Sequence, residues 1–263
     1  MKTIIIYIYY KSQSADYNLS FYVKKELSYK NNIDYIIVIN GFDSDIIFPE
    51  LDNLKILKRD NIGFDFGGHN YALEYLDKNN KIYDYYFFMN SGVLGPIIPH
   101  YLNNIHWSSY FINKINNIVK LVGTTIVCLP NTDHGGYGPK VEGFFFMTDK
   151  IGLNLLQNEK TIFCNHDTFY STIINGEYGL SNCIIKNGYS IDCMLHKYQG
   201  IDWLNKDNWN LNNNIHPSRK NSFYNTTINP YEVIFHKWFW HNEDNISFDI
   251  IEQYVNNHNN FDR

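Results

Sequence analysis

The chain has 263 residues, of which 44% are hydrophobic and 17% aromatic, and its formal net charge is −5. This apolar content is enough for one large domain with a sizeable core, so it excludes an intrinsically disordered chain. No basic block is present, which argues against nucleic acid as a partner.

Four cysteines are spread along the chain: Cys128, Cys164, Cys183 and Cys193. They have neither the spacing of a zinc site nor the density of a disulfide scaffold. We therefore expect buried free thiols in a reducing compartment. The apolar run near the N-terminus is too short for a signal peptide or a membrane helix. A cytoplasmic protein without a transmembrane segment is expected.

The first half of the chain alternates strand and helix patterns. Residues 3–10 are a continuous β-branched and aromatic run, typical of a strand covered on both faces. A helix is expected over residues 18–30, capped by Asn18 or Ser20. Further strands are expected over residues 34–42, 53–60 and 83–96, and the last of these stops abruptly at residues 90–92. A helix over residues 67–79 precedes that fourth strand.

The second half continues the alternation less regularly. Residues 118–130 read as a strand pair, and residues 141–156 as a strand followed by a helix. Residues 167–191 read as helical, with a break near Asn175 and Gly176 and a stop at Gly188. The polar residues 205–227 predict a long loop that acts as a lid.

This order predicts an α/β fold with a mostly parallel, Rossmann-like central sheet flanked by helices. We expect a single domain over residues 1–240, which contains the late apolar segment 229–240. A C-terminal helical extension is expected over residues 241–263. The sequence leaves open whether that extension packs on its own domain or on a neighbour.

Ligands of open α/β sheets bind beyond the carboxyl ends of the strands. One unusual stretch in such a place is "RDNIGFDFGGHNYALEYL", residues 59–76. It concentrates Gly63, Gly67 and Gly68 around Asp65, just before an apolar helical pattern. Glycine lets a backbone approach a partner closely, so the stretch predicts ligand binding. The alternative is a helix N-terminus at which Asp65 caps backbone amides.

Several motifs, taken in order, resemble one enzyme family. They are "NIGFDFGG" (residues 61–68), "FFMNSGVLGP" (87–96), "EYGLSNCIIKNGYSI" (177–191) and "NPYEVIFHK" (229–237). Together they are similar to glycosyltransferases of the rhamnan-synthesis F type and their eukaryotic and viral relatives, which have the GT-A nucleotide-sugar fold. The resemblance implies transfer of a rhamnose-type or other hexose unit from a nucleotide-sugar donor to a glycan or glycoprotein acceptor, with inversion.

The resemblance also implies a donor-binding site. In the related enzymes the segment after the third strand packs under the nucleotide, with an aspartate at the base or ribose and glycines beside it. The residues expected to bind the donor are Asn40, Arg59, Asn61, Gly63, Asp65, Gly67, Gly68, Asn90, Ser91, Gly92 and Lys237. His69 is expected to pack inside the protein.

A divalent cation is the cofactor that the resemblance implies, and the sequence departs from the family pattern here. Asn90, Ser91 and Gly92 stand where such enzymes carry Asp-x-Asp, and an amide is a poor ligand for a hard dication. Either Mn²⁺ or Mg²⁺ binds weakly at Asn90 and His236, with help from Asp133 or His134, or no metal is used. Lys237 and Arg59 would then neutralise the diphosphate.

Glu177 is the expected general base, because in the inverting relatives an acidic pair starts the helix that leads to Gly-Tyr. Only the first acid of the pair is kept here, since Tyr178 stands in the second place. Complementing a helix dipole would explain the same glutamate. Asp167 is the competing base, and Glu142 is a candidate ligand of sugar hydroxyls. The alternative function is a catalytically silent protein that binds nucleotide sugars or glycans. A methyltransferase is disfavoured, because no glycine-rich loop follows the first strand.

The tryptophans suggest sugar stacking, but core packing is the expectation in a chain this aromatic. They are Trp203, Trp209, Trp238 and Trp240.

Overall fold

The computed structural model describes residues 1–27, 33–102, 105–212, 214–239 and 251–256. The strands within these ranges are β1 (Thr3–Tyr10), β2 (Ile33–Asn40), β3 (Leu54–Arg59), β4 (Tyr85–Asn90), β5 (Val119–Gly123), β6 (Ile126–Leu129), β7 (Gly138–Val141), β8 (Phe145–Asp149) and β9 (Ser190–Cys193). The helices are α1 (Gln13–Lys25), α2 (Phe64–Lys78), α3 (Ser108–Ile112), α4 (Lys150–Asn158), α5 (Phe169–Ser171), α6 (Tyr178–Lys186) and α7 (Pro230–Val233).

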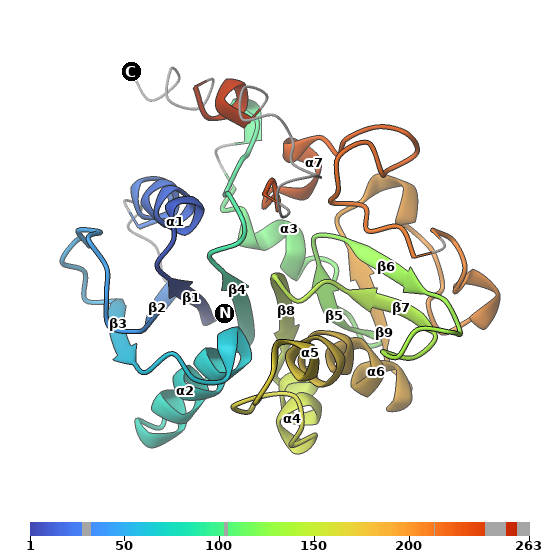
Figure 1. Ribbon diagram of the computed structural model, residues 1–263, viewed down its shortest axis with the longest axis horizontal. Helices are drawn as coiled ribbons and strands as arrows, with labels where there is room; N and C mark the ends of the chain where they lie inside the picture. The colour runs from blue at the N-terminus through green and yellow to red at the C-terminus, as the bar shows by residue number, and fades with distance from the viewer. Residues whose placement is uncertain (28–32, 103–104, 213, 240–250, 257–263) are drawn as a thin grey trace.

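A seven-stranded sheet with the order β3-β2-β1-β4-β8-β5-β9 forms the centre of the molecule (Figure 1). All neighbouring strands are parallel except β8, which runs antiparallel to both β4 and β5. The strands β6 and β7 form a separate antiparallel pair. The expected α/β architecture with a mostly parallel sheet is therefore confirmed.

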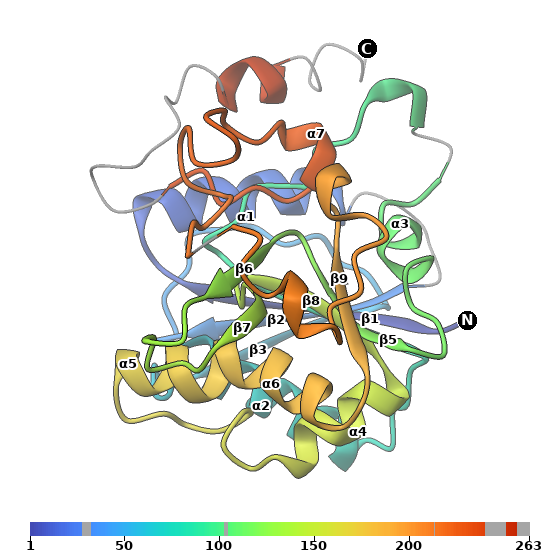
Figure 2. The same ribbon diagram turned by 90° about the vertical axis from the view of Figure 1, so that its right-hand side faces the viewer.

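Helices cover both faces of the sheet, which explains why β1 is buried on both sides (Figures 1 and 2). Its even-numbered residues, such as Ile6, pack with apolar side chains of α2, α4 and α6. Its odd-numbered residues, such as Tyr7, pack with α1 and α3. The two-residue period of a strand divides one apolar run between two cores.

Some expected boundaries were wrong. Helix α1 begins at Gln13, earlier than expected, because the Ser12 hydroxyl accepts a hydrogen bond from the Ala15 amide and caps it. The expected cap Asn18 is buried inside this helix instead. The expected stop at Gly188 agrees with the end of α6 at Lys186, but the edge strand β9 that follows was not expected; it pairs in parallel with β5.

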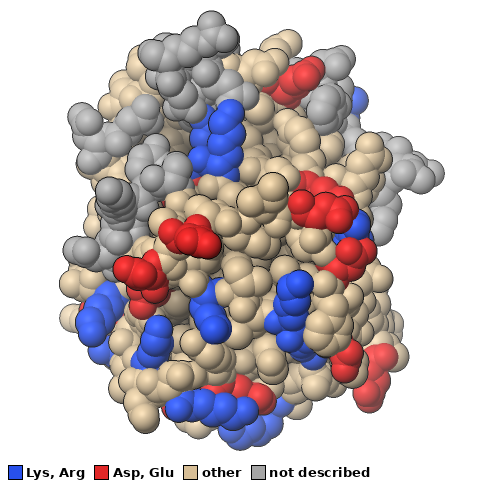
Figure 3. Space-filling view, turned by 90° about the vertical axis from the view of Figure 1, so that its left-hand side faces the viewer, with Lys and Arg blue, Asp and Glu red and all other residues tan. Residues whose placement is uncertain are grey.

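The expected break in the helix of residues 167–191 is a change of helix type and not an interruption. The π-helix Thr172–Glu177 connects α5 to α6 at that place, and the chain stays helical through it. Within the described residues, no helix is both long and apolar enough to cross a membrane. The face of the molecule beside β3 carries lysine and arginine side chains interspersed with aspartate and glutamate over its described part (Figure 3).

Candidate functional site

The carboxyl ends of the first four strands lie along one edge of the sheet. Tyr10, Asn40 and Arg59 end β1, β2 and β3 and are paired in register, and Asn90 ends β4. Strand β8 runs the other way, so its first residue, rather than its last, lies at this edge. Residues 142–144 therefore reach the same edge, and the Asn90 amide donates to the Phe144 carbonyl (3.1 Å).

The segment after α7 also reaches this edge. Leu94 and His236 form an antiparallel bridge, with hydrogen bonds of 2.9 Å in both directions. This bridge positions Lys237, whose Nζ lies 5.2 Å from the centroid of the Phe144 ring. Lys237 is thus brought to side chains that lie about ninety residues or more before it in the chain.

Asp65 is held between the start of α2 and the end of β4. Its Oδ2 accepts from Asn90 Nδ2 (2.8 Å) and its Oδ1 from the Phe66 amide (3.0 Å). Burial raises the pKa of Asp65, while these hydrogen bonds and the Lys237 ammonium oppose the rise. The alternative prediction of an Asp65 cap holds in part: Gly63 and not Asp65 occupies the N-cap of α2, but the Asp65 carboxylate does accept a backbone amide in the first turn.

Glu177 is the last residue of the π-helix and faces the loop before β8. A Cβ on Gly143 would lie 2.6 Å from the Glu177 Cγ, so only glycine fits there. Burial, together with the carboxylates of Asp65 and Glu142, raises the pKa of Glu177 to about 7 against the opposing effect of Lys237.

Glu142 is 4% exposed and is held by three donors. His216 Nδ1 lies 2.8 Å from its Oε1, the Ser218 hydroxyl donates to its Oε2 (3.2 Å), and the Thr125 hydroxyl makes a short hydrogen bond to that same oxygen. Burial alone would raise the pKa of Glu142, but these partners and Lys237 bring it below its usual value. Glu142 is consequently a fixed negative charge.

Lys237 is the common neighbour of the three acids. Its charge acts on the pKa of Asp65, Glu142 and Glu177 alike. The carboxylates come from three separate parts of the chain, and the ammonium from a fourth. We call this group of four residues the acid–lysine cluster.

The guanidinium of Arg59 is largely engaged by the protein itself. It donates to the Ile62 carbonyl (2.7 Å), to Asn165 Oδ1 (2.9 Å) and more weakly to Asn40 Oδ1 (3.4 Å). These bonds hold the turn before α2 against the segment around residue 165. Arg59 therefore has a structural role at the edge of the site. Its charge is not among those that shift the pKa of Asp65, Glu142 or Glu177.

Close packing within the protein accounts for the glycines around Asp65. A Cβ on Gly68 would lie 2.8 Å from Ile8 Cγ2, and one on Gly67 would lie 2.6 Å from both Asn165 Oδ1 and the Ile62 carbonyl oxygen. Gly63 has φ +72°, and a Cβ there would lie 2.4 Å from the Asn165 Cα. The space beside these glycines is filled by β1 and the neighbouring loop, and not by an open approach to a ligand.

The two residues expected to bind a metal do not fit that role well. The Asn90 Oδ1 accepts from the Gly92 amide (2.9 Å), and its nitrogen is bonded to Asp65. His236 is 1% exposed, and burial lowers its pKa to about 4. No group of three or more histidine, cysteine, aspartate or glutamate side chains in the described ranges could hold a metal ion. Asp133, the expected helper, accepts the Gly135 amide (2.7 Å).

The remaining expected site residues lie at the margin of the cluster. Asp167 and Asn61 are exposed, and Asp167 is not among the charges that act on Glu177. The Ser91 carbonyl accepts from Asn18 Nδ2 (2.9 Å). His69 packs inside the protein as expected, between the rings of Phe66, Phe88 and Phe146.

The expectations for the tryptophans and the cysteines hold in most places. Trp203 and Trp238 are buried, as core packing requires, whereas Trp209 is partly exposed and Trp240 lies outside the described residues. All four cysteines are free thiols, and only Cys164 is not fully buried.

The polar loop of residues 205–227 is anchored at several points, so its described part does not have the loose contacts expected of a lid. Asn212 Oδ1 accepts the Cys128 amide (2.7 Å), and Asn212 Nδ2 donates to the Ile126 carbonyl (2.8 Å). His216 and Ser218 then bond Glu142, as described above. Sequence reasoning missed His216, because nothing in its local spacing distinguishes it from any polar loop residue.

Comparison with known proteins adds no relative. The chain matches no protein-family model and no curated protein.

Proposed function

We propose that the protein is a nucleotide-sugar glycosyltransferase of GT-A type that transfers a hexose to a glycan acceptor with inversion. The observation that carries the proposal is the acid–lysine cluster, in which Glu177 has a pKa of about 7 beside two further carboxylates and a lysine. Its position beyond the carboxyl ends of parallel strands is where α/β sheets bind ligands. The motif resemblance supports the same reaction class.

Glu177 is the proposed general base. It removes the proton of an acceptor hydroxyl while that oxygen forms a bond to the anomeric carbon of the donor sugar. The bond from this carbon to the phosphate oxygen breaks, and its electron pair leaves with the diphosphate. A base with a pKa near the working pH is the most effective for such a step. Asp167 lies outside the cluster, so Glu177 is the better candidate of the two.

Lys237 is the proposed counter-charge for the leaving diphosphate. Its ammonium lowers the pKa of all three acids of the cluster, and it needs no metal to act. Asp65 and Glu142 are the proposed stabilisers of the positive charge that develops on the sugar ring, because hydrogen bonds within the protein fix both carboxylates. No step here depends on a divalent cation.

The alternative is a silent protein that binds nucleotide sugars without turnover. One observation favours it: Asn90, where the family carries carboxylates, has both its amide oxygen and its amide nitrogen engaged within the protein.

The first test is thermal unfolding of the full chain with UDP, dTDP, GDP and CMP, each with Mn²⁺ and with EDTA. A ligand that binds only the native state stabilises it by RT ln(1 + [L]/Kd), about 2.7 kcal/mol at a hundredfold excess over Kd. We expect one nucleotide to raise the unfolding midpoint in EDTA. Lys237→Ala should lose most of that shift, and Lys81→Ala, an exposed lysine at the opposite edge of the sheet, should keep it. No shift with any nucleotide would refute the proposal.

The second test separates the enzyme from its silent alternative. The nucleotide that stabilises the protein identifies the class of donor, and release of that nucleotide from the corresponding nucleotide sugars is then followed over hours. Slow hydrolysis of a donor that Glu177→Gln abolishes supports a transferase. Binding without release by wild-type protein, with and without added glycans, supports the silent alternative.

A further inference from the structure

Four exposed rings form two pairs, which are connected because one ring of each pair belongs to adjacent residues at the start of α5. They are Phe64 (38% exposed), Phe169 (61%), Tyr170 (57%) and the exposed His134. The centroids of Phe64 and Phe169 lie 6.0 Å apart and those of His134 and Tyr170 lie 6.4 Å apart, while Phe169 and Tyr170 are neighbours in the chain. We call these four residues the aromatic row.

Backbone conformation fixes the positions of the rings in the aromatic row, and at Phe64 that conformation is energetically unfavourable. Phe64 has φ +56°, a left-handed conformation that a bulky residue rarely adopts and that costs about 1–3 kcal/mol. Its carbonyl accepts from Asn40 Nδ2 (3.2 Å), which fixes this conformation. The start of α5, which carries Phe169 and Tyr170, is closed by a capping box between Thr168 and Ser171. Strain that keeps an apolar ring in solvent is typical of a binding site.

The row leads to the proposed base. Phe64 directly precedes Asp65, and the helix that begins at Phe169 runs on through the π-helix to Glu177. Glu177 follows Phe169 by eight positions along this helix. The loop that carries His134 lies against the same helix. Its Gly135 packs closely against the ring of Tyr178, the first residue of α6.

The chemistry of the row fits linked sugar rings. Pyranoses have apolar CH faces and hydroxyl-bearing rims, so they suit flat rings flanked by polar groups. The exposed residues Asn165 and Asp167 precede Phe169 in the chain, and exposed Asn175 follows Tyr170. A contiguous exposed apolar patch marks a binding site. A nucleobase stacks on aromatic rings as well, but one base covers only part of a row of four.

We propose that the aromatic row is the acceptor subsite, which binds two or more linked sugar residues of a glycan and directs its terminal hydroxyl towards Glu177. The acceptor role rests on the proposed function. The binding of glycan by the row does not, and it can be measured without a donor.

The test uses the full chain on a printed array of plant, microbial and animal oligosaccharides. The variant Phe169→Ala/Tyr170→Ala removes two exposed rings, and Tyr101→Ala removes a 72% exposed ring from a different segment as a control. We expect wild-type protein and the control to bind a common class of glycan, and the double variant to bind it roughly tenfold or more weakly. The unfolding midpoint and its shift with nucleotide should be equal in all three proteins.

Three results would overturn the inference: a wild-type protein that binds no glycan, a double variant that binds as well as wild type, or a double variant that loses the nucleotide shift. The last result would make the row a nucleobase platform. Failure of the proposed function looks different, because nucleotides then stabilise no variant while ring-dependent binding of glycan persists.

Discussion

The surroundings of Glu177 give it a measurable signature. Its pKa of about 7 reflects burial and two neighbouring carboxylates, so transfer should decline as the pH falls through 7 and the base takes up a proton. Glu177→Gln should lower the turnover rate by about 10²–10⁴-fold and leave nucleotide binding intact. Asp167→Asn is the matched control, since the exposed Asp167 lies outside the cluster. Equal losses from both substitutions would contradict the assignment of the base.

His69 should make the protein sensitive to mild acid. Burial lowers its pKa to about 3, so the native state keeps it neutral while the unfolded chain protonates it. Stability should therefore fall as the pH drops from about 6.5 towards 3, by up to about 1.4 kcal/mol per pH unit from this group. Neither ring nitrogen has a hydrogen-bond partner.

Chemical denaturation of His69→Leu between pH 7 and pH 4 checks this. The variant should be at least as stable as wild type at pH 7, because it removes an unsatisfied buried polar group. It should lose less stability on acidification. Parallel pH curves for the two proteins would show that His69 is not the sensitive group.

Asn90 offers a test of the metal question. In Asn90→Asp a carboxylate replaces the amide that donates to Asp65, so two carboxylates would face each other. In EDTA we expect the variant to lose about 1–3 kcal/mol of unfolding free energy, and its unfolding midpoint to fall accordingly. Added Mn²⁺ should restore that midpoint. Wild type should show no comparable response to Mn²⁺. If Mn²⁺ stabilises both proteins equally, the native residues already hold a cation.

At the residue scale, the sequence indicated which residues carry candidate chemistry, but not which residues contact one another. Asp65, Glu177 and Lys237 were recognisable from motifs, and the structure places all three in one cluster. The roles of Arg59 and of Gly67 were not recognisable, because their partners, Asn165 above all, lie about a hundred residues away in the chain. Only the folded backbone reveals that the glycines make room for the protein itself.

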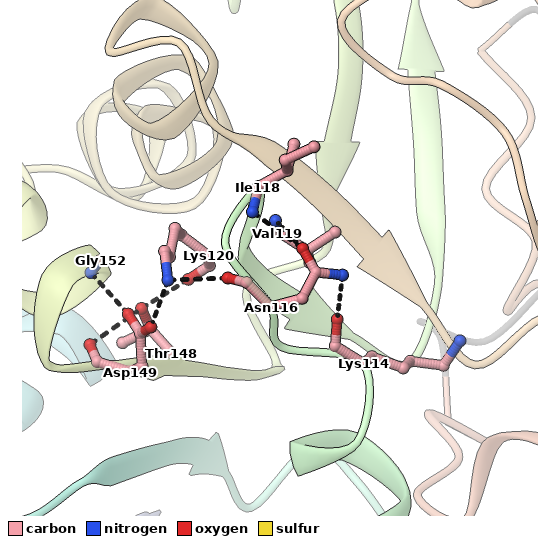
Figure 4. A network of polar contacts seen from close by, with 8 residues as sticks. All are labelled: Lys114, Asn116, Ile118, Val119, Lys120, Thr148, Asp149 and Gly152. Atoms are coloured by element: carbon pink, nitrogen blue, oxygen red, sulfur yellow. Dashed lines mark hydrogen bonds and ion pairs between the residues drawn. The ribbon is translucent and has the colours of Figure 1, made fainter.

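Among the elements, reversed strand β8 has the largest influence on the site. Because it runs against its neighbours, the residues that precede it arrive at the carboxyl edge, and Glu142 and Gly143 become part of the cluster. Its far end, Asp149, lies at the opposite edge of the sheet. There Asp149 pairs with Lys120 (2.7 Å), and both side chains are nearly buried (Figure 4).

Breaking this pair should destabilise the sheet. Asp149 also caps α4 by accepting the Gly152 amide (2.9 Å), so Asp149→Ser retains a cap and removes the charge that compensates Lys120. We expect a loss of about 3–5 kcal/mol in urea unfolding. The control Asp84→Ser breaks the exposed pair with Lys150 and should cost at most about 1 kcal/mol. Similar losses of unfolding free energy from both substitutions would mean that burial does not increase the contribution of the Lys120–Asp149 ion pair to stability.

Strands and helices with a strong hydrophobic pattern along the sequence were predictable, and those without one were not. The run from Thr3 to Tyr10 has the composition of a doubly covered strand and is one. Strand β9 was missed because its four residues follow a helix directly and have no period of their own. Its identity as a strand depends on pairing with β5, about seventy residues earlier.

On the scale of the whole molecule, the chain's last described residues return to its beginning. Ile251 and Val255 pack into a cluster with Phe21 of α1, Leu94 and Trp238. Buried Asn18 connects the same regions, because its Oδ1 accepts from the Trp238 indole (2.8 Å) while its amide reaches the Ser91 carbonyl. The C-terminal segment therefore braces the region that positions Lys237.

Ile251→Ala should cost about 2–4 kcal/mol of unfolding free energy, since the side chain is fully buried in that cluster. The exposed neighbour Glu252→Ala should change it by less than about 0.5 kcal/mol. Urea titration compares the two. A negligible effect of Ile251→Ala would mean that residues 251–256 do not pack on this domain in solution.

The π-helix before Glu177 has an evolutionary consequence. A π turn accommodates one residue more than an α turn, and each residue of an α-helix rotates the next by about 100°. Loss of a single exposed residue such as Asn175 would convert the turn to α. With the buried face of α6 and Glu177 kept in place, the residues before the deletion, Phe169 and Tyr170 among them, would rotate by about 100° about the helix axis. A homologous chain could therefore turn its aromatic row away from the proposed base by a one-residue insertion or deletion, with no change in its core and with every motif residue still present in its sequence.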